Sequence, residues 1–233
     1  MGKRALGNSD GRRPARARGG TDPTDGGPRQ AGRPVGASGD RTRERVLAAA
    51  LEAFAEQGFA GTSMRDIARK ARIRVSSLYH YFPSKESLYG EVQAKAEGER
   101  RQLVLAVMSE ARDLREVTRE ATGRLFDFLV ANPAYVRLGL HDRLEGGVLF
   151  DRRTFDRWLG LMEGMMKPAE MQGRIKPVDP VAFIASVDAL VHWHAANNGY
   201  YRAMLGKGFE DPAVVRRARE HVVQVVLRMV GLE

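Results

Sequence analysis

Side chains that can bond to the base edges and phosphates of a nucleic acid are concentrated between residues 63 and 80. A guanidinium such as that of Arg74 can bond in bidentate fashion to guanine, and Val75 can contact the methyl group of thymine. Hydroxyl and imidazole groups can bond to bases or phosphates, and a serine at a helix N-terminus can meet a phosphate beside backbone amides. The candidate contacts are Ser63, Arg74, Val75, Ser76, Ser77, Tyr79 and His80. Packing between helices is the alternative role for Tyr79 and His80.

Short helices and tight turns must position those side chains. The first predicted helix begins after Asp40 or Thr42 and carries apolar residues at helical spacing. It ends at Gly58, because glycine favours the left-handed conformation of a C-terminal cap. Thr62 and Ser63 then offer an N-cap for a second helix, and Asp66 lies three residues after Ser63, where a capping-box partner belongs.

A turn of three residues separates the second helix from a third. The second helix covers Met64 to Lys70, and residues 72–74 connect it to a helix from Val75 to Tyr81, which Pro83 stops. Ser84 caps a fourth helix. Two short helices joined by such a turn form a helix-turn-helix, which lays its second helix in the major groove of DNA.

The stretch from Thr42 to Val92 resembles the DNA-binding domain of the TetR family of transcriptional regulators. The resemblance rests on several motifs in a fixed order, namely AAALEAFAEQGF, GTSMRDIA, LYHYF and SKE followed by Leu88. It covers about fifty residues of the chain, so it is specific to this family.

The resemblance assigns roles to individual positions. It implies that the helix over residues 75–81 is the recognition helix and that Lys85 contacts a phosphate. Two residues depart from the family pattern. Arg72 stands where the family usually has a glycine in the turn, and Arg74 stands where it usually has a serine that caps the recognition helix. The loss of a cap costs about 0.5–2 kcal/mol.

Composition limits the class of protein. The chain has 233 residues, a net charge of +9 and no cysteine, which excludes disulfides, thiolate nucleophiles and cysteine-based zinc sites. Its length suits one or two small domains, and its charge suits an anionic partner. The N-terminus lacks the apolar run of a signal peptide, so we expect a soluble, cytoplasmic protein.

Residues 1–40 form a predicted disordered, basic tail. They are rich in Gly, Pro, Ala and Arg, with eight Lys and Arg against four Asp. So few large apolar residues cannot offset the entropy of ordering the chain. The tail is either a basic arm that reaches phosphates or a minor groove, or only a solubilising segment. A start codon assigned too early is a further alternative.

The rest of the chain predicts helices and no strand, so the fold class is all-α. An N-terminal three-helix helix-turn-helix domain, 41–88, is joined to a larger helical domain, 89–233, for ligand binding and dimerisation. The predicted helices cover Ser84–Glu110, Leu114–Ala131, Ala134–Leu144, Phe150–Met166, Val181–Tyr201 and Pro212–Val230, with a loop over Lys167–Pro180.

The last two predicted helices are candidates for a dimer interface. Residues 181–201 carry Asp188 as their one acid and are otherwise mostly apolar, aromatic or small, so that helix must be covered on most sides. Its polar residues argue against a membrane span. The last helix has a heptad-like seam of Val215, Ala218, Val222, Val225 and Met229. In the family, these two helices pair with their copies across a two-fold axis; packing within one chain is the alternative.

The family also implies a small-molecule pocket in the C-terminal domain. A pocket needs apolar walls and a few polar groups. The candidate ligand-binding residues are Phe126, Tyr135, Phe155, Trp158, Met162, Asp188, His192 and Trp193, and ordinary core packing is the alternative for each apolar one. Asp188 and His192 lie four residues apart, so they share a helix face and can form a charge-assisted pair.

Metal-dependent and other catalytic functions receive no support. His192 and His194 point about 200° apart on a helix, so they do not readily chelate one ion. No nucleophile elbow, zinc-protease motif, P-loop or dinucleotide-binding motif occurs, and we expect neither a cofactor nor catalysis. The sequence therefore predicts a DNA-binding repressor that a small molecule releases from a palindromic operator. The alternative is an architectural DNA-binding protein without a ligand.

Overall fold

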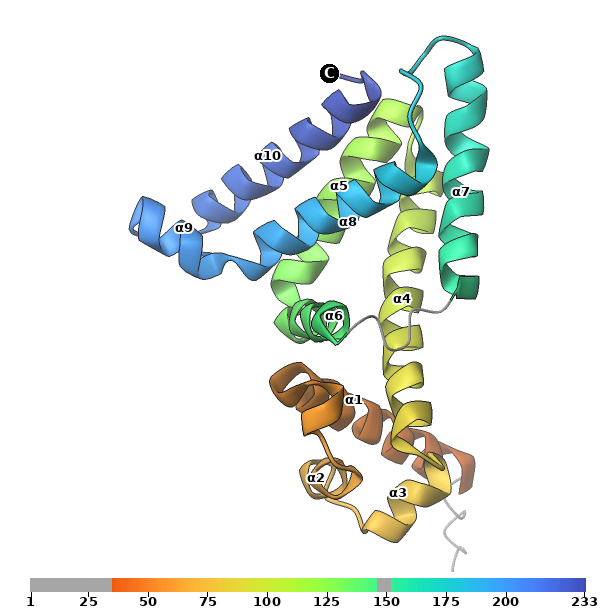
Figure 1. Cartoon of the computed structure of the whole chain (residues 1–233), viewed down its shortest axis with the longest axis vertical. Helices are drawn as coiled ribbons and strands as arrows, with labels where there is room; N and C mark the ends of the chain where they lie inside the picture. The colour runs from red at the N-terminus through yellow and green to blue at the C-terminus, as the bar shows by residue number, and fades with distance from the viewer. Residues whose placement is uncertain (1–34, 146–151) are drawn as a thin grey trace, which may run out of the picture.

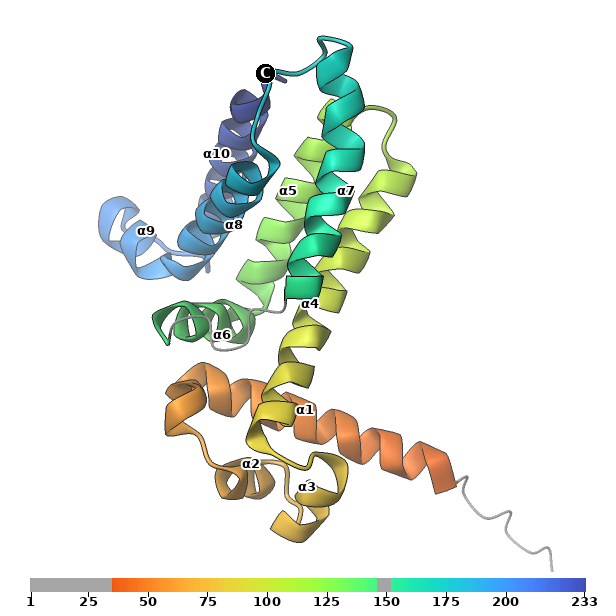
Figure 2. The same ribbon diagram turned by 45° about the vertical axis from the view of Figure 1, so that its right-hand side comes forward.

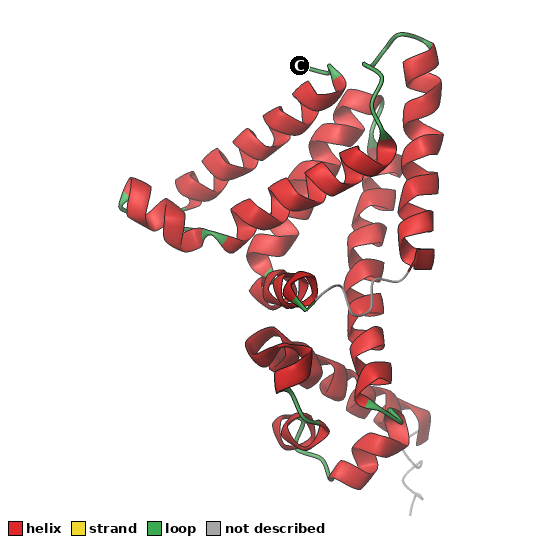
Figure 3. Cartoon of the chain, in the orientation of Figure 1, coloured by secondary structure: helices red, strands yellow, loops and turns green. Residues whose placement is uncertain are grey.

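The computed structural model describes residues 35–145 and 152–233, which form helices joined by short turns and contain no strand (Figure 3). The helices are α1 (Val35–Gly61), α2 (Met64–Lys70), α3 (Val75–Tyr81), α4 (Lys85–Glu110), α5 (Leu114–Ala131), α6 (Pro133–Leu144), α7 (Arg152–Met171), α8 (Pro180–Ala196), α9 (Asn198–Leu205) and α10 (Pro212–Val230). Helices α1 to α3 form the lower unit in Figure 1, and α5 to α10 form the upper one, with α4 running between them.

In the lower unit, the helices α2 and α3 begin and end where the sequence predicts. Helices α2 and α3 have the predicted bounds, and the Ser63 hydroxyl accepts a hydrogen bond from the backbone N–H of Asp66 at 3.2 Å. Of the two predicted caps of α2, Ser63 is therefore the one that caps the helix. Gly58 has a positive φ of 71°, so the regular part of α1 ends there as predicted and one further turn reaches Gly61.

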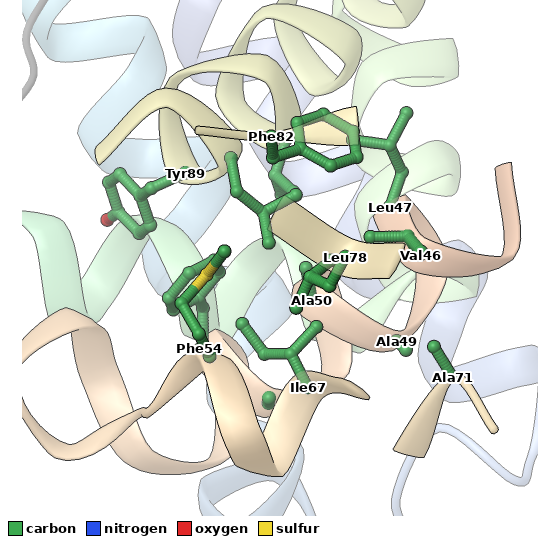
Figure 4. Close-up of a cluster of buried hydrophobic side chains, with 14 of the residues drawn as sticks. Val46, Leu47, Ala49, Ala50, Phe54, Ile67, Ala71, Leu78, Phe82 and Tyr89 are labelled. Carbon is green, nitrogen blue, oxygen red and sulfur yellow. The ribbon is translucent and has the colours of Figure 1, made fainter. Parts of the chain in front are cut away.

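A shared hydrophobic core holds the lower unit together (Figure 4). Phe54 of α1, Ile67 of α2 and Leu78 of α3 are fully buried, and Phe82 closes the core after α3. Full burial of such a side chain contributes about 1.5–3 kcal/mol. Tyr89 of α4 packs edge-on against Phe54, with 4.8 Å between ring centroids, so the first turns of α4 belong to this core.

Helix α4 belongs to both units. Its N-terminal part buries Leu88, Tyr89 and Val92 in the lower core, and further along it buries Val104 and Val107 in the upper unit. The predicted domain boundary between residues 88 and 89 falls inside this helix. The two units are thus joined by a continuous helix, with no intervening loop (Figure 2).

The upper unit packs around α5. Helix α5 lies against α4, α8 and α10 and contributes Leu125, Phe126 and Leu129 to a core shared with α8 and α10. A second cluster joins the C-terminal part of α7 to the ends of α8 and α10. None of the helices in the described ranges is long and apolar enough to cross a membrane.

The predicted start of α1 and the predicted end of α7 were wrong. Helix α1 begins at Val35, so residues 35–40 are helical although we predicted them as part of the tail; the rest of the tail lies outside the described residues. Helix α7 continues through Pro168 to Met171, where we predicted a loop. Burial of Met166 and Ala169 in the core at the end of α7 keeps this last turn helical although a proline removes one hydrogen bond. The predicted start of this helix, Phe150, also lies outside the described residues.

The predicted helix over residues 181–201 is two helices. Helix α8 ends at Ala196, and Asn197 adopts a non-helical conformation before α9 begins. The Asn197 side chain donates to the carbonyl of Trp193 at 2.6 Å, and the Asn198 side chain accepts from the N–H of Phe209 at 2.6 Å. Asparagine side chains that bond to the backbone in this way compete with helical hydrogen bonds, which explains the break.

The end of α6 fits closely against Gly58. A Cβ atom at Gly58 would lie 2.2 Å from Oε1 of Glu145 and 3.0 Å from Nδ1 of His141. Nearby, the Tyr89 hydroxyl donates to Oδ1 of Asp142 at 3.3 Å. This position therefore needs glycine because of its positive φ, and a Cβ there would also displace the side-chain ends of Glu145 and His141.

We expect Gly58→Ala to lower the free energy of unfolding by about 1–2 kcal/mol, because it places a side chain at a positive φ. Urea denaturation measures the change. Gly98→Ala is the matched control, since nothing lies within 4 Å of its Cβ position in the middle of α4, and we expect it to raise stability by up to about 1 kcal/mol. Equal effects of the two substitutions would contradict the need for glycine at position 58.

Candidate DNA-binding surface and interior cavity

Helix α3 presents most of the predicted DNA contacts on an exposed face at the lower end of the molecule (Figure 1). The side chains exposed on or next to it are Arg72, Arg74, Ser76, Ser77, Tyr79 and His80. Tyr79 is 49% exposed, so it is not a core residue. Val75 is only partly buried against the lower core, while Leu78 is completely buried. The helix thus has one packed face and one free face.

The turn before α3 is built as a helix C-terminal motif. The N–H of Ile73 donates to the carbonyl of Ala68, and the N–H of Arg72 donates to the carbonyl of Arg69, a pattern that satisfies the last carbonyls of α2. Arg72 has a φ of 55°, which makes it the one non-glycine residue with positive φ among those described. Arg74 is the N-cap of α3 and makes no side-chain capping bond. Glycine would therefore fit the backbone better at position 72, and a capping residue such as serine would fit better at position 74.

Lys85 has internal partners that the sequence did not reveal. Its ammonium donates to the carbonyls of Phe59 at 2.9 Å and Thr62 at 3.1 Å, and it lies 4.2 Å from the centre of the Phe59 ring. These contacts tie the start of α4 to the loop between α1 and α2. The geometry favours a positioning role for Lys85 over the free phosphate contact we predicted. The Ser63 hydroxyl is likewise engaged, since it bonds to the carboxylate of Asp66.

A cavity of about 1020 Å³ lies in the upper unit between α4, α5, α7 and α8, with α6 at one end. Apolar side chains make up most of its wall. The predicted ligand-binding residues that line it are Tyr135, Phe155, Trp158, Met162, Asp188 and His192. These residues come from the three consecutive helices α6, α7 and α8, and the fold brings them together around one cavity.

Two predicted pocket residues lie elsewhere. Phe126 is completely buried in the core between α5 and α10, because Leu125 and Leu129 occupy the face of α5 that lines the cavity. Trp193 is 48% exposed and packs against His194 and Tyr200 on the outside of α8. Our prediction that they line the pocket was wrong.

A cluster of charged side chains occupies the end of the cavity nearest α6. Asp188 bonds to Nη2 of Arg100 at 3.0 Å, to Nδ1 of His192 at 3.1 Å and to Arg143. Nη1 of Arg100 bonds to Glu97 at 2.7 Å. The expected contact between Asp188 and His192 is therefore present. Sequence reasoning missed the other members, because charged residues on a long helix normally face solvent.

The partners of Asp188 keep it ionised. Burial by itself would raise the pKa of this carboxyl group. The hydrogen bond from His192 and the charges of His192, Arg100 and Arg143 outweigh burial, and they hold the pKa of Asp188 far below its ordinary value. The cluster thus contains a permanent carboxylate that fixes side chains of α4, α6 and α8 relative to one another.

The predicted seam of α10 is only partly available to a second copy. Ala218 and Val222 are buried within the chain itself, against α5. Val215, Val225 and Met229 are partly buried. The middle of the seam therefore packs against α5 in the core of the same chain. Only Val215, Val225 and Met229 are partly exposed at the surface.

Comparison with known proteins identifies the family. Residues 46–92 match the model described as bacterial regulatory proteins, tetR family, and residues 115–226 match the model described as tetracyclin repressor-like, C-terminal domain. The structure of SCO4942 from Streptomyces coelicolor is 32% identical in sequence, with a TM-score of 0.61, over 82% of this chain and 99% of that one. The chain belongs to the TetR family.

This TetR-family protein is accordingly a ligand-responsive, DNA-binding transcriptional regulator of the repressor type. The HTH-type transcriptional regulator RutR of Escherichia coli K12 is 27% identical over 206 residues, which cover 79% of this chain and 88% of that protein. The structure of the regulator FadR from Bacillus subtilis, in complex with stearoyl-CoA, shares the fold at 16% identity and a TM-score of 0.63, over 80% of this chain and 98% of that one.

Arg72→Gly is expected to raise the free energy of unfolding by about 0.5–1 kcal/mol, because it removes left-handed strain at the turn. Thermal or urea denaturation measures it. Arg72→Ala separates strain from charge, since it removes the same charge and keeps the strain. If Arg72→Ala raised the free energy of unfolding as much as Arg72→Gly, the charge of Arg72 and not its backbone conformation would be what destabilises the turn.

Asp188→Asn should lower the free energy of unfolding by about 3 kcal/mol, because it leaves Arg100 and Arg143 without their shared carboxylate. The control Asp156→Asn, in an exposed pair with Arg152, should cost less than about 1 kcal/mol. Since the folded pKa of Asp188 is depressed, its contribution is present above the unfolded pKa of about 3.9 and is lost as pH falls toward the folded pKa. Denaturation at pH 7 that does not separate the two variants would contradict the proposed role of the cluster.

Proposed function

We propose that this TetR-family protein is a homodimeric repressor that binds a palindromic operator through α3 and leaves it when a small molecule occupies the cavity. One observation carries the proposal: the wall of the cavity and the core of the DNA-binding unit are made in part from the same two helices. Helix α4 contributes to both, and α6 places Leu138 in the lower core while Gly139 and Arg143 line the cavity.

The exposed face of α3 supports sequence-specific binding. Arg74 can bond to guanine, and Ser76 and Ser77 can bond to bases or phosphates. Tyr79 and His80 can contact the phosphate backbone of the DNA. Lys85 supports this face indirectly, because it fixes the loop between α1 and α2. The DNA-binding unit therefore divides into residues that contact DNA and residues that position them.

The ion cluster offers a route from ligand to DNA. Arg143 of α6 bonds to Asp188 of α8 inside the cavity, and the C-terminal end of α6 fits against Gly58 of α1. A ligand that alters the position of Arg143 would therefore shift a helix that contacts the DNA-binding unit. A ligand acts in this way only if it binds the DNA-free arrangement better than the DNA-bound one.

Dimerisation through α8 and α10 is supported by apolar side chains at the surface of these helices and of α9. Trp193, Tyr200 and Met204 are 48%, 51% and 63% exposed. With the partly buried Val225 and Met229 of α10, they provide an apolar surface for a second copy. This set replaces Ala218 and Val222, which the chain buries itself.

The sequence left an architectural DNA-binding protein as the alternative, and the free face of α3 alone would serve either function. The cavity with its ion cluster favours the ligand-controlled repressor, because an architectural protein has no need of such a cavity. The two differ in DNA preference, since a repressor binds one palindrome tightly and an architectural protein binds many sites weakly.

Selection of bound fragments from random DNA by the full chain tests the proposal. We expect an inverted repeat whose half-sites are roughly 34–36 Å apart, or a multiple of that distance. Fragments without a shared inverted repeat, all bound with similar weak affinity, would support the architectural function and contradict the repressor.

Substitutions in the recognition region should separate base reading from positioning. Arg74→Ala should relax the preference at one base pair of each half-site, at a cost of about 1–3 kcal/mol. Lys85→Met should weaken binding to all sequences alike and lower thermal stability, while the slope of affinity against salt stays as in the parent protein. Titrations at several salt concentrations measure both. A reduced salt slope for Lys85→Met would instead assign Lys85 to a phosphate.

A further inference from the structure

We propose that Arg72, in the turn between α2 and α3, binds a DNA phosphate at the edge of the major groove, and that this contact is the reason for the strained backbone at this position. The inference rests on the proposed DNA-binding role of α3 and adds a residue to it. Three observations carry it, namely a backbone conformation, an unpaired side chain and the place of the turn beside α3.

The backbone of Arg72 is left-handed, a conformation that suits glycine. Its φ is 55°, and the other positive φ angles among the described residues belong to Gly58, Gly173, Gly206 and Gly231. Of these, Gly206 and Gly231 are the left-handed C-caps of α9 and α10. Glycine favours such helix ends because it has no Cβ atom to clash with the backbone. The end of α2 is the exception in this chain.

No hydrogen bond or ion pair within the described part of the chain explains why this residue is an arginine. The Arg72 side chain is exposed, and its guanidinium has no such partner there. The neighbouring cations do have partners, since Arg69 bonds to Asp66 at 2.7 Å and Lys70 bonds to Glu56 at 3.0 Å. Strained residues are concentrated at functional sites, so the partner of Arg72 is sought outside the chain.

The charge around the turn favours an anion. Arg69, Lys70, Arg72 and Arg74 fall within six residues that contain no acid. The first two are paired with carboxylates, and the last two are left without a counter-charge among the described residues. The backbone N–H groups of residues 71–73 already donate to carbonyls of α2, so the side chains must bind the anion. A guanidinium suits a phosphate because it can donate two parallel hydrogen bonds.

The turn leads into the end of α3 that enters the groove. Figure 1 shows it at the lower end of the molecule, between α2 and α3. A recognition helix contacts base edges with its N-terminal residues, which in α3 are Val75 and Ser76. The segment just before them therefore passes the edge of the groove, where the phosphates lie. Arg72 precedes the first residue of α3 by three positions, so we assign it to a phosphate.

Variants at position 72 separate the contact from the strain. Arg72→Gly removes the charge and the strain, Arg72→Ala removes the charge alone, and Arg72→Lys keeps both. The control Arg174→Ala removes an exposed, unpaired cation from the loop between α7 and α8, at the opposite end of the molecule (Figure 1). Each full-length protein is titrated at several salt concentrations with the selected DNA and with a duplex of unrelated sequence. Urea denaturation measures the stability of each variant.

We expect Arg72→Gly and Arg72→Ala to bind the selected DNA roughly tenfold to a hundredfold more weakly at about 0.1 M salt, because a dimer loses two phosphate contacts. For the same reason, the slope of log affinity against log salt should become shallower by about 1.8. Arg72→Lys and Arg174→Ala should keep the parent slope. Of the position-72 variants, Arg72→Gly should be the one that gains stability, so its stability rises while its affinity falls.

A gain in stability by Arg72→Gly with unchanged affinity and salt slope would overturn the proposal. An equal loss of slope in Arg174→Ala would assign the effect to net charge, and a changed base preference in the Arg72 variants would assign Arg72 to a base; either result would also overturn it. On the unrelated duplex, the slope should become shallower by about 0.9 per bound chain. Because this second titration needs no operator, the absence of a shared inverted repeat would count against the repressor and leave the test of Arg72 intact. The absence of binding to either duplex would contradict both.

Discussion

The packing of α4 in the core of the DNA-binding unit at one end and against α5 at the other is the constraint on which the rest of the structure depends. Leu88, Tyr89 and Val92 are buried with the helices of the DNA-binding unit, and Val104 and Val107 are buried in the upper unit. A rigid helix that is fixed at both ends holds the recognition helix in a defined position relative to the cavity. Because α4 is closely packed in the lower core, a displacement of its cavity-lining part would be transmitted to the DNA-binding unit.

Helix α6 adds a second connection, and polar contacts define it. Tyr89 packs on Phe54 and bonds to Asp142, so α1, α4 and α6 meet at one aromatic residue. On the cavity side, Arg143 of α6 bonds to Asp188. The upper and lower units are therefore coupled through the ion cluster as well as through α4. A ligand that disturbs this cluster would act on side chains of both α4 and α6.

Much of the fold could be predicted from the sequence, because the residues that begin and end its helices act locally. Ser63, Gly58 and the turn over residues 72–74 are recognisable from a few neighbouring residues, and the structure confirms the helix bounds that they set. The site was less predictable, because it depends on tertiary contacts. The pairing of Arg100 with Asp188 joins residues 88 positions apart, and nothing in either helix indicates it. Phe126 and Trp193 have the composition of pocket residues, but the direction in which their helices face places them elsewhere.

The distance between two recognition helices in the complex with DNA tests the central claim most directly. The chain has no cysteine, so Glu86→Cys, at an exposed position at the start of α4 that is not a proposed DNA contact, accepts a single spin label close to α3. With the selected DNA bound, the account predicts one narrow distance distribution on the order of 34–36 Å, as two helices in successive major grooves require. No dipolar coupling, or a broad distribution in the bound state, would contradict a dimer that presents two recognition helices at a fixed separation.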